Sequence, residues 1–170
     1  MSNPEWLAHD DETGRDLFLL PISAAEAPLR LPEHLRPFVC LLVWDAAAEP
    51  VEVVSHVAES LLASGCVYLC VWGDGCSRVH DIFDEVIVGD GSRESIAAAP
   101  LVLTTWHDGE SLDSALWFFL RSTAPDEAIA TECRSGVAVV VGGDPERCAE
   151  VYCALKSPGD FSARMAEGSD

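Results

Sequence analysis

The sequence predicts an α/β protein with a single three-layer α/β/α domain, whose mainly parallel sheet has four or five strands in a Rossmann-like or flavodoxin-like arrangement. Two observations predict this fold class. Continuous apolar runs, which are typical of strands buried on both faces of a sheet, alternate with segments whose apolar residues recur at helical spacing. A chain of 170 residues, 49% of them hydrophobic, is also long enough for one packed domain and short for two.

The first predicted strand and helix occupy residues 38–64. Residues 38–44 form an uninterrupted apolar run that ends at Asp45. Pro50 suits the first turn of a helix and Gly65 suits its end, because proline fixes the backbone angle φ and glycine tolerates the left-handed conformation. One face of this predicted helix is apolar: Val51, Val54, Ala58, Leu61 and Leu62.

The second unit repeats this pattern. Residues 66–72 form an apolar strand, residues 73–75 a tight loop and residues 77–85 a helix. Residues 86–88 fit either the end of that helix or an edge strand.

Two further units complete the predicted sheet. The third has a strand at 100–106 and a helix from about residue 110 to residue 122. The fourth has a strand at 137–141, after which Asp144 and Pro145 suit the N-cap and first turn of a last helix. Strands that alternate with helices in this way predict a parallel sheet covered on both faces.

The two ends of the chain are predicted to lie outside the sheet. Residues 1–36 hold four of the ten prolines and only one apolar cluster, so we expect an acidic, Pro-rich arm that lies on the α/β domain of residues 37–156. Residues 157–170 are rich in Gly, Ser and acids, which predicts a disordered tail.

Charge is the unusual feature of the composition. Asp and Glu number 29 against 10 Lys and Arg, which gives a net charge of −19. Such a field repels phosphates and anionic lipids, and the few basic residues are scattered, so we expect neither nucleic acid nor a membrane as a partner. The same field either keeps the chain soluble or attracts a basic protein.

The sequence predicts a cytoplasmic protein. Its first residues lack the basic and long apolar regions of a signal peptide, and its longest apolar runs are far shorter than the roughly 20 residues of a membrane-spanning helix. Seven cysteines without a CxxC pair indicate reduced thiols. Five of them lie in predicted strands or helices, where we expect small buried hydrophobic residues: Cys40, Cys66, Cys70, Cys148 and Cys153.

Three predicted strands end alike, in a tryptophan followed closely by an aspartate. Parallel strands bring their carboxyl ends to one edge, where ligands bind in such folds. The candidate ligand-binding residues are therefore Trp44, Asp45, Trp72, Asp74, Trp106 and Asp108. The alternative is structural, because a bulky residue followed by Asp or Gly is ordinary turn chemistry and Asp108 can cap a helix.

Cys76, His80 and His107 are the candidate catalytic residues. Cys76 lies near a predicted helix N-terminus, where the helix dipole lowers a thiol pKa, and either histidine is a candidate base. The same three residues are candidate zinc ligands, and Asp45, Asp74 and Asp108 are candidate magnesium ligands. The structural alternative is a solvated His80–Asp84 pair beside a buried Cys76.

The sequence lacks four familiar enzyme motifs: GxGxxG after the first strand, GxxxxGK[ST], GxSxG and HExxH.

Trp117 and Phe118 are candidate interface residues. They lie off the main apolar stripe of their predicted helix, so either the arm of residues 1–36 or another protein chain covers them.

Two motifs carry a family resemblance: WGxxCxxxHDxxD in residues 72–84 and TTWHDxxxxxxALW in residues 104–117. In these motifs the chain resembles an uncharacterised bacterial domain family of about the same length. The resemblance extends from residue 38 to about residue 156 and implies a bacterial domain, but it implies no activity. It directs attention to Cys76, His80, Asp81, Trp106, His107 and Asp108.

These observations favour a small acidic cytosolic protein that masks a basic protein partner, as an immunity or antitoxin-type inhibitor does. The alternative is a metal- or Cys-dependent hydrolase whose site lies at the carboxyl edge of the sheet. A third hypothesis is a small-ligand sensor that uses the tryptophans of that edge.

Overall fold

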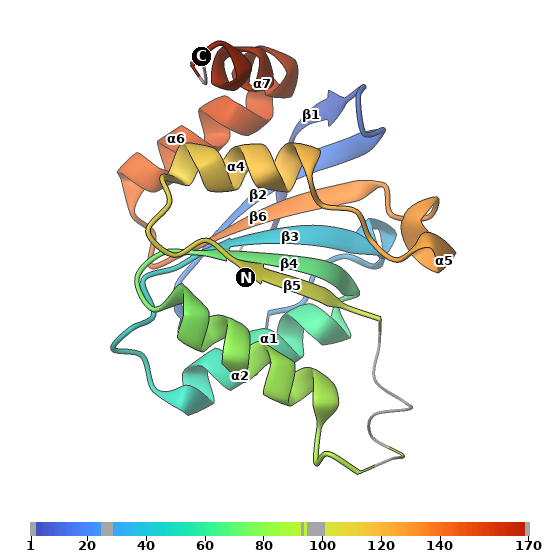
Figure 1. Cartoon of the computed structure of the whole chain (residues 1–170), viewed down its shortest axis with the longest axis vertical. Coiled ribbons are helices and arrows are strands. Elements are labelled where there is room, and N and C mark those ends of the chain that lie inside the picture. The colour runs from blue at the N-terminus through green and yellow to red at the C-terminus, as the bar shows by residue number, and fades with distance from the viewer. Residues whose placement is uncertain (1–2, 25–28, 93, 95–100, 169–170) are drawn as a thin grey trace.

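A six-stranded sheet forms the centre of the computed structural model, which describes residues 3–24, 29–92, 94 and 101–168. The strands lie in the order β1-β2-β6-β3-β4-β5 (Figure 1). β1 pairs with β2 in an antiparallel manner, and every other pair is parallel. Their bounds are Glu5–Asp10 (β1), Arg15–Ile22 (β2), Phe38–Val43 (β3), Cys66–Trp72 (β4), Leu103–Trp106 (β5) and Ser135–Val141 (β6).

Helices cover both faces of this sheet. α1 (Val51–Ala63) and α2 (Cys76–Val88) lie on one face, whereas α4 (Leu112–Arg121), α6 (Pro145–Lys156) and α7 (Pro158–Glu167) lie on the other (Figure 1). A separate hydrophobic core fills the space between the sheet and each helical layer. The predicted three-layer α/β/α fold class is therefore confirmed.

The predicted elements differ from the observed ones mainly at their ends. Residues 86–88 belong to α2, and residue 100, where the third strand was expected to begin, lies outside the described residues. A 3-10 helix, η2 (Glu33–Leu35), and the short helix α5 (Glu127–Ala130) were not predicted. No helix in the described part of the chain has the length and apolar character needed to cross a bilayer.

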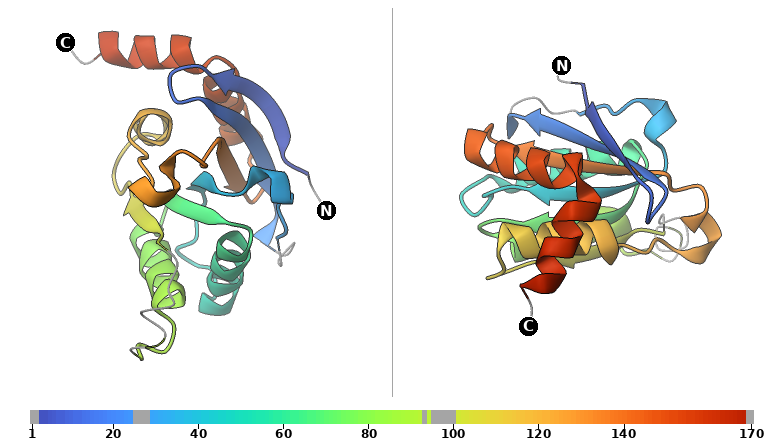
Figure 2. Two further views of the ribbon diagram at one scale, coloured as in Figure 1. Left: turned by 90° about the vertical axis from the view of Figure 1, so that its right-hand side faces the viewer. Right: turned by 90° about the horizontal axis from the view of Figure 1, so that it is seen from above.

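The N-terminal segment contributes two strands instead of forming an arm outside the sheet. β2 lies between β1 and β6, so the sheet has six strands, not the predicted four or five. Pro21 is accommodated because β1 pairs with β2 only as far as Leu19, which leaves one side of the strand unpaired at the proline. Figure 2 shows this hairpin at the opposite edge of the sheet from β5.

The C-terminal segment forms α7 where the sequence predicts a disordered tail. Phe161 is buried in the same core as α4, and Met165 packs against that core four residues later. Residues four apart share one helical face, so these two large apolar side chains place one face of the helix against the domain.

Candidate functional site

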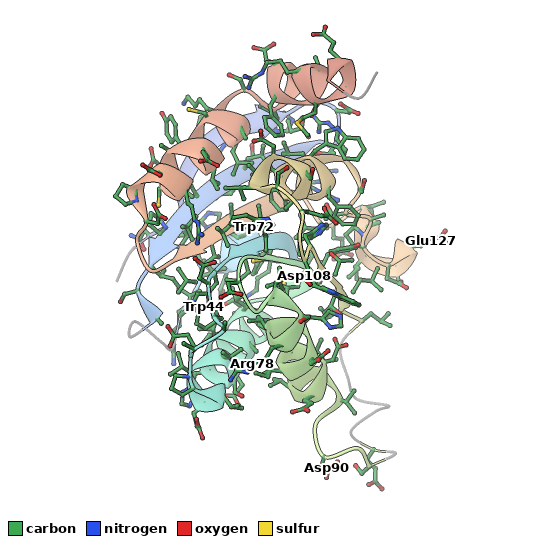
Figure 3. The ribbon with its side chains drawn as sticks, turned by 60° about the vertical axis from the view of Figure 1, so that its left-hand side comes forward. Trp44, Trp72, Arg78, Asp90, Asp108 and Glu127 are labelled. Atoms are coloured by element: carbon green, nitrogen blue, oxygen red, sulfur yellow. The ribbon has the colours of Figure 1, made fainter. Side chains whose placement is uncertain are left out.

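The carboxyl ends of β3, β4 and β5 meet at one edge, as predicted. Trp44, Trp72 and Asp108, labelled in Figure 3, follow or end these strands. Between the strand ends lies a shallow depression of about 280 Å³, lined by Asp45, Trp72, Gly73, Asp74, His107, Asp108, Gly109, Glu110 and Arg147. Trp44 is not part of its wall, because this side chain is 2% exposed in the core beneath α1 and α2.

An internal ion pair occupies one side of this depression. Arg147, in the first turn of α6, places Nη1 2.7 Å from Oδ2 of Asp45. The other oxygen of Asp45 accepts a hydrogen bond of 2.8 Å from the backbone N–H of Asp74. Burial raises the pKa of Asp45, but this hydrogen bond and the charge of Arg147 outweigh it, so the pKa lies below its ordinary value. Both carboxylate oxygens therefore have partners within the protein.

Trp72 is held from two directions at the same edge. Its indole Nε1–H donates a 2.9 Å hydrogen bond to the carbonyl of Glu110. The guanidinium carbon of Arg147 lies 5.1 Å from the centre of its ring, which is cation–π geometry. Since Arg147 covers this ring, Trp72 offers less free aromatic surface to a ligand than the sequence suggests.

The two candidate histidines lie on opposite faces of β5. Successive side chains of a strand point to opposite faces, so Thr104 and Trp106 face α2, whereas Thr105 and His107 face α4. His80 of α2 packs on Trp106, with 4.4 Å between the ring centres, and its Nε2 lies 3.0 Å from the Thr104 hydroxyl.

Each histidine has a carboxylate partner on its own face of the sheet. The hydroxyl of Thr104 donates to Oδ1 of Asp84 at 2.9 Å, and Oδ2 of Asp84 lies 3.5 Å from Nε2 of His80. On the other face, Nδ1 of His107 lies 3.0 Å from Oε2 of Glu110, and the His107 ring packs against Phe118. The structural alternative is found in part: His80 pairs with Asp84 and Cys76 is buried, but the His80 side chain is only 12% exposed, so the pair is not fully solvated.

Cys76 is a buried core residue. Its side chain is 1% exposed and packs in the core beneath α1 and α2. Burial raises the pKa of this thiol, assisted by the negative charge of Asp108, and the opposing hydrogen bond from the backbone N–H of His107 is too weak to reverse the shift. The expected activation by the helix N-terminus is therefore outweighed, and Cys76 stays a protonated thiol that solvent does not reach.

Thiol chemistry gives a direct test of this burial. Cys153 is exposed and Cys148 is half-buried, so the expectation that both are buried is wrong. Cys76 and the four remaining cysteines are buried. Iodoacetamide at pH 8 is therefore expected to alkylate one thiol per native chain rapidly, at Cys153. Peptide mapping by mass spectrometry checks the site, and Cys153→Ser removes the fast phase. Rapid labelling of Cys76 in the native chain would contradict the buried assignment.

Neither candidate metal set is assembled. Throughout the described ranges, no group of three or more His, Cys, Asp or Glu side chains is placed to hold a metal ion. The zinc set of Cys76, His80 and His107 is divided between the two faces of β5. The magnesium set fails because Asp45 already gives its oxygens to Arg147 and to the Asp74 N–H.

The free edge of β5 is where apolar side chains reach solvent. Among the described residues, β5 ends the sheet and pairs with β4 alone. Leu103 is 47% exposed, Trp106 49% and Trp117 39%. Beside them is a groove of about 510 Å³ between β5, α4 and α7, lined by Thr105, Trp106, His107, Glu110, Ser114, Trp117, Phe118, Met165 and Ala166. Of the two covers expected for Trp117 and Phe118, the strands of the N-terminal segment do not provide one, because β1 and β2 lie at the opposite edge of the sheet.

Exposed carboxylates flank these apolar side chains on both sides of β5. On the α2 side, the side chain of Asp81 is 77% exposed and that of Asp84 is 47% exposed. On the α4 side, Glu110 is 47% exposed. Among the described residues that line the groove there is no lysine or arginine. We call this surface the Trp106 face; its apolar residues are Leu103, Trp106, Trp117 and Phe118, and its acidic residues are Asp81, Asp84 and Glu110.

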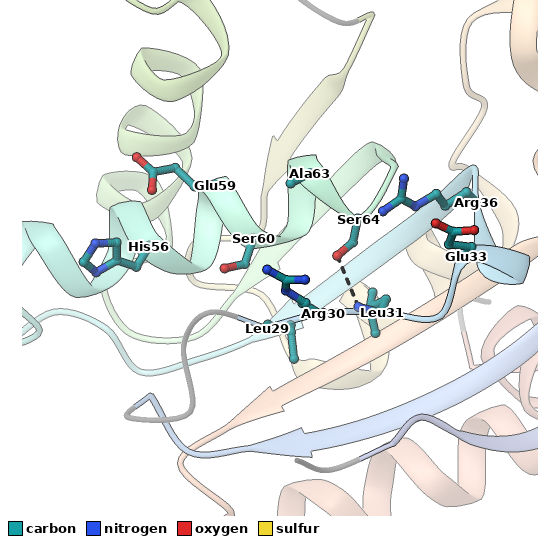
Figure 4. A pocket seen from close by; sticks show the side chains of 10 residues that line it. All are labelled: Leu29, Arg30, Leu31, Glu33, Arg36, His56, Glu59, Ser60, Ala63 and Ser64. Carbon is teal, nitrogen blue, oxygen red and sulfur yellow. Dashed lines mark hydrogen bonds between the residues drawn. The ribbon is translucent and has the colours of Figure 1, made fainter.

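A larger hollow, of about 610 Å³, lies elsewhere on the molecule, between residues 29–36 and α1 (Figure 4). Its polar rim mixes Arg30 and Arg36 with Glu33 and Glu59. Because these charges balance, the hollow favours neither anions nor cations, and none of the predicted site residues lines it.

Sequence reasoning missed three residues that shape the site. Glu110 follows His107 by three positions, and Arg147 lies in the first turn of α6. Thr104 lies two residues before Trp106, the last residue of the predicted strand. The spacing of Glu110 from His107 was an available signal. The pairing of Arg147 with Asp45 had no such signal, because more than 100 positions separate the two residues in the sequence.

Comparison with known protein families gives a match over most of the chain. Residues 19–157 match the model of a family described as Domain of unknown function (DUF7684), so the match begins within β2 and ends before α7. No curated protein and no solved structure matches the chain.

Proposed function

The chain belongs to the DUF7684 family, and we propose that it is a small acidic binding protein that masks a basic protein partner, as an immunity or antitoxin-type inhibitor does. The observation that carries this proposal is the Trp106 face. Its partly exposed tryptophans beside a groove, with carboxylates on both sides of β5, have the anatomy of a protein interface, in which aromatic anchors dominate the binding energy.

The charge of the chain selects the kind of partner. With a net charge of −19, the protein attracts basic surfaces over long distances and repels acidic ones. The rim of the apolar surface is itself acidic, because it includes the exposed carboxylates of Asp81, Asp84 and Glu110. Lysine or arginine side chains of a partner would lie against these carboxylates. Because the rim is exposed, we expect added salt to slow association more than it changes dissociation.

The arrangement gives less support to the hydrolase alternative. A nucleophile needs an accessible, ionisable group next to its base, whereas Cys76 is buried with a raised pKa. His80 and His107 each contact a carboxylate, but they do so on opposite faces of β5. The small-ligand sensor also has less support, because Asp45, Arg147 and Trp72 satisfy one another within the strand-end depression.

A selection experiment with matched variants tests the proposal. A phage-displayed library of random 16-residue peptides is selected on the wild-type chain after depletion on Trp106→Ala, which has the same net charge. We expect the selected peptides to be enriched in Lys and Arg and to bind Trp106→Ala about 30-fold more weakly, the loss typical of an interface hot spot. Surface plasmon resonance at two salt concentrations measures affinity and association rate.

Trp6→Ala is the control for this experiment. Trp6 is 54% exposed, close to the 49% of Trp106, but lies on β1 at the opposite edge of the sheet. Peptides that recognise the Trp106 face bind Trp6→Ala as tightly as the wild type. Selection of peptides without basic enrichment, or equal losses in the two variants, would overturn the proposal. Melting temperatures of both variants verify that they are folded.

A further inference from the structure

We propose that the basic partner binds as an extended strand that adds to the open side of β5; this inference rests on the proposed function and specifies how the Trp106 face recognises its partner. Strand addition to a sheet edge takes its affinity from backbone hydrogen bonds and its selectivity from alternate side chains.

Two residues of β5 have a backbone side that pairs with no strand in the described part of the chain. The N–H of His107 donates to the carbonyl of Val71 in β4 at 3.0 Å. Because backbone groups of successive strand residues point to opposite sides, Thr105 shares the direction of His107, whereas Thr104 and Trp106 direct their N–H and C=O groups away from β4. These two residues offer a partner strand two donors and two acceptors.

β5 is short, with four residues, but within the described residues its edge lacks three other common protections against strand addition. Natural edge strands are commonly blocked by proline, by lysine or by a bulge. β5 has the sequence Leu-Thr-Thr-Trp and pairs with β4 in a regular register without a bulge. The side chain of Thr104 is fixed by Asp84 and His80, at 2.9 Å and 3.0 Å, which holds the strand in an extended form before a partner arrives.

The charges beside β5 favour a basic strand over a second copy of this chain. Side chains of an added strand alternate between the two faces of the sheet, so one set would lie near Asp81 and Asp84 on α2 and the other near Glu110. Pairing between two copies would bring two such acidic rims together, each belonging to a chain of net charge −19. Arginine or lysine side chains complement the same rims.

Thr104→Pro tests the backbone contact directly. Proline removes the N–H that faces away from β4 and leaves the ladder between β4 and β5 in place, an arrangement that edge strands tolerate. Thr104→Val is the matched control, since it loses the same hydroxyl contacts but keeps the N–H. The probe is a fluorescent octapeptide in which arginine and valine alternate, together with a copy N-methylated at every second residue.

We expect the octapeptide to bind the wild type and Thr104→Val within about threefold of each other, and to bind Thr104→Pro at least about tenfold more weakly. The N-methylated copy is expected to show a similar loss on the wild type. Hydrogen exchange followed by NMR gives a second readout: the amides of Thr104 and Trp106 are expected to exchange more slowly with the octapeptide bound, whereas that of Thr105, already paired, is expected to be unchanged.

The outcomes separate the binding mode from the function. Equal binding of the octapeptide to Thr104→Pro and Thr104→Val, with unchanged exchange at Thr104 and Trp106, would overturn strand addition. So would failure of the octapeptide to bind while library-selected basic peptides do bind; in both cases the proposed function stands. If the library yields no basic peptides, the proposed function fails, and strand addition by a basic partner fails with it.

Discussion

Replacing Arg121 by methionine is expected to destabilise the fold by about 3–5 kcal/mol, the cost typical of removing one partner from a buried ion pair. Nη1 of Arg121 lies 2.7 Å from Oδ2 of Asp10, and Nη2 lies 3.3 Å from Oδ1. The Arg121 side chain is 8% exposed and that of Asp10 is 3% exposed. Without the guanidinium, the carboxylate of Asp10 stays buried without its cation. Urea unfolding at pH 7 measures the loss.

The same ion pair predicts how the loss varies with pH. Burial raises the pKa of Asp10, but the hydrogen bonds from Arg121 and Thr13 and the charge of Arg121 outweigh it and hold the pKa below its ordinary value of 3.8. The wild type therefore loses stability as pH falls through that lowered pKa. In Arg121→Met, burial dominates and raises the pKa of Asp10. Protonation of Asp10 as pH falls therefore removes the unpaired buried charge and part of the loss of stability. The difference between the two proteins is expected to shrink below about pH 5.

A double variant tests whether the unpaired charge causes the loss. Asp10→Asn combined with Arg121→Met removes both charges, and it is expected to recover much of the stability that Arg121→Met loses. If the double variant is as unstable as the single one at pH 7, packing of the Arg121 side chain matters more than its charge. The pair also bears on function, since it joins β1 to the end of α4, the helix that carries Trp117 and Phe118.

The central strands could be predicted from the sequence because of where they lie. A strand buried on both faces needs apolar residues throughout, and every residue of β3 and of β6 is buried. β1 alternates exposed and buried residues irregularly, and β2 contains Arg15, Asp16 and Pro21. Their membership of the sheet depends on pairing with β6, which follows more than 100 positions later in the chain. Local patterns do not encode such pairing.

The candidate site could be predicted only in part, because the sequence indicates a parallel sheet but does not give the order of its strands. That strands end together at one edge follows from a parallel sheet, and Trp72, Asp74 and Asp108 do line one depression. Strand order does not follow, so the sequence could not show that β5 ends the sheet. β5 nevertheless carries a signal: two threonines occupy its centre, and none of its four residues is buried.

The separation of His80 from His107 was predictable from strand periodicity alone. His107 directly follows Trp106, and adjacent strand residues point to opposite faces of a sheet. A histidine of α2 that packs on Trp106 therefore lies on the other face from His107. The prediction placed both histidines at one site because both lie near strand ends, and it neglected the two-residue period of a strand.

Replacing Gly73 by alanine is expected to destabilise the fold by about 3–4 kcal/mol, because a backbone penalty and a steric clash add. Gly73 has a φ of 125°, a conformation that side chains disfavour, and an added Cβ would lie 2.3 Å from the carbonyl oxygen of Trp44. The neighbouring strand end would have to move. The hydrogen bond from the Asp74 N–H to Asp45 would be lost, and the pKa of Asp45 would rise towards its ordinary value.

Gly143→Ala is the matched control for the close approach of the two strand ends. Gly143 also has a positive φ, of 66°, but an added Cβ would have nothing within 4 Å. Only the conformational penalty applies there, about 1 kcal/mol. Chemical unfolding of the two variants compares these costs. Equal losses would mean that the contact with Trp44 adds nothing to the ordinary left-handed penalty, whereas a loss about 2 kcal/mol larger at Gly73 is expected from that contact together with its more extreme φ.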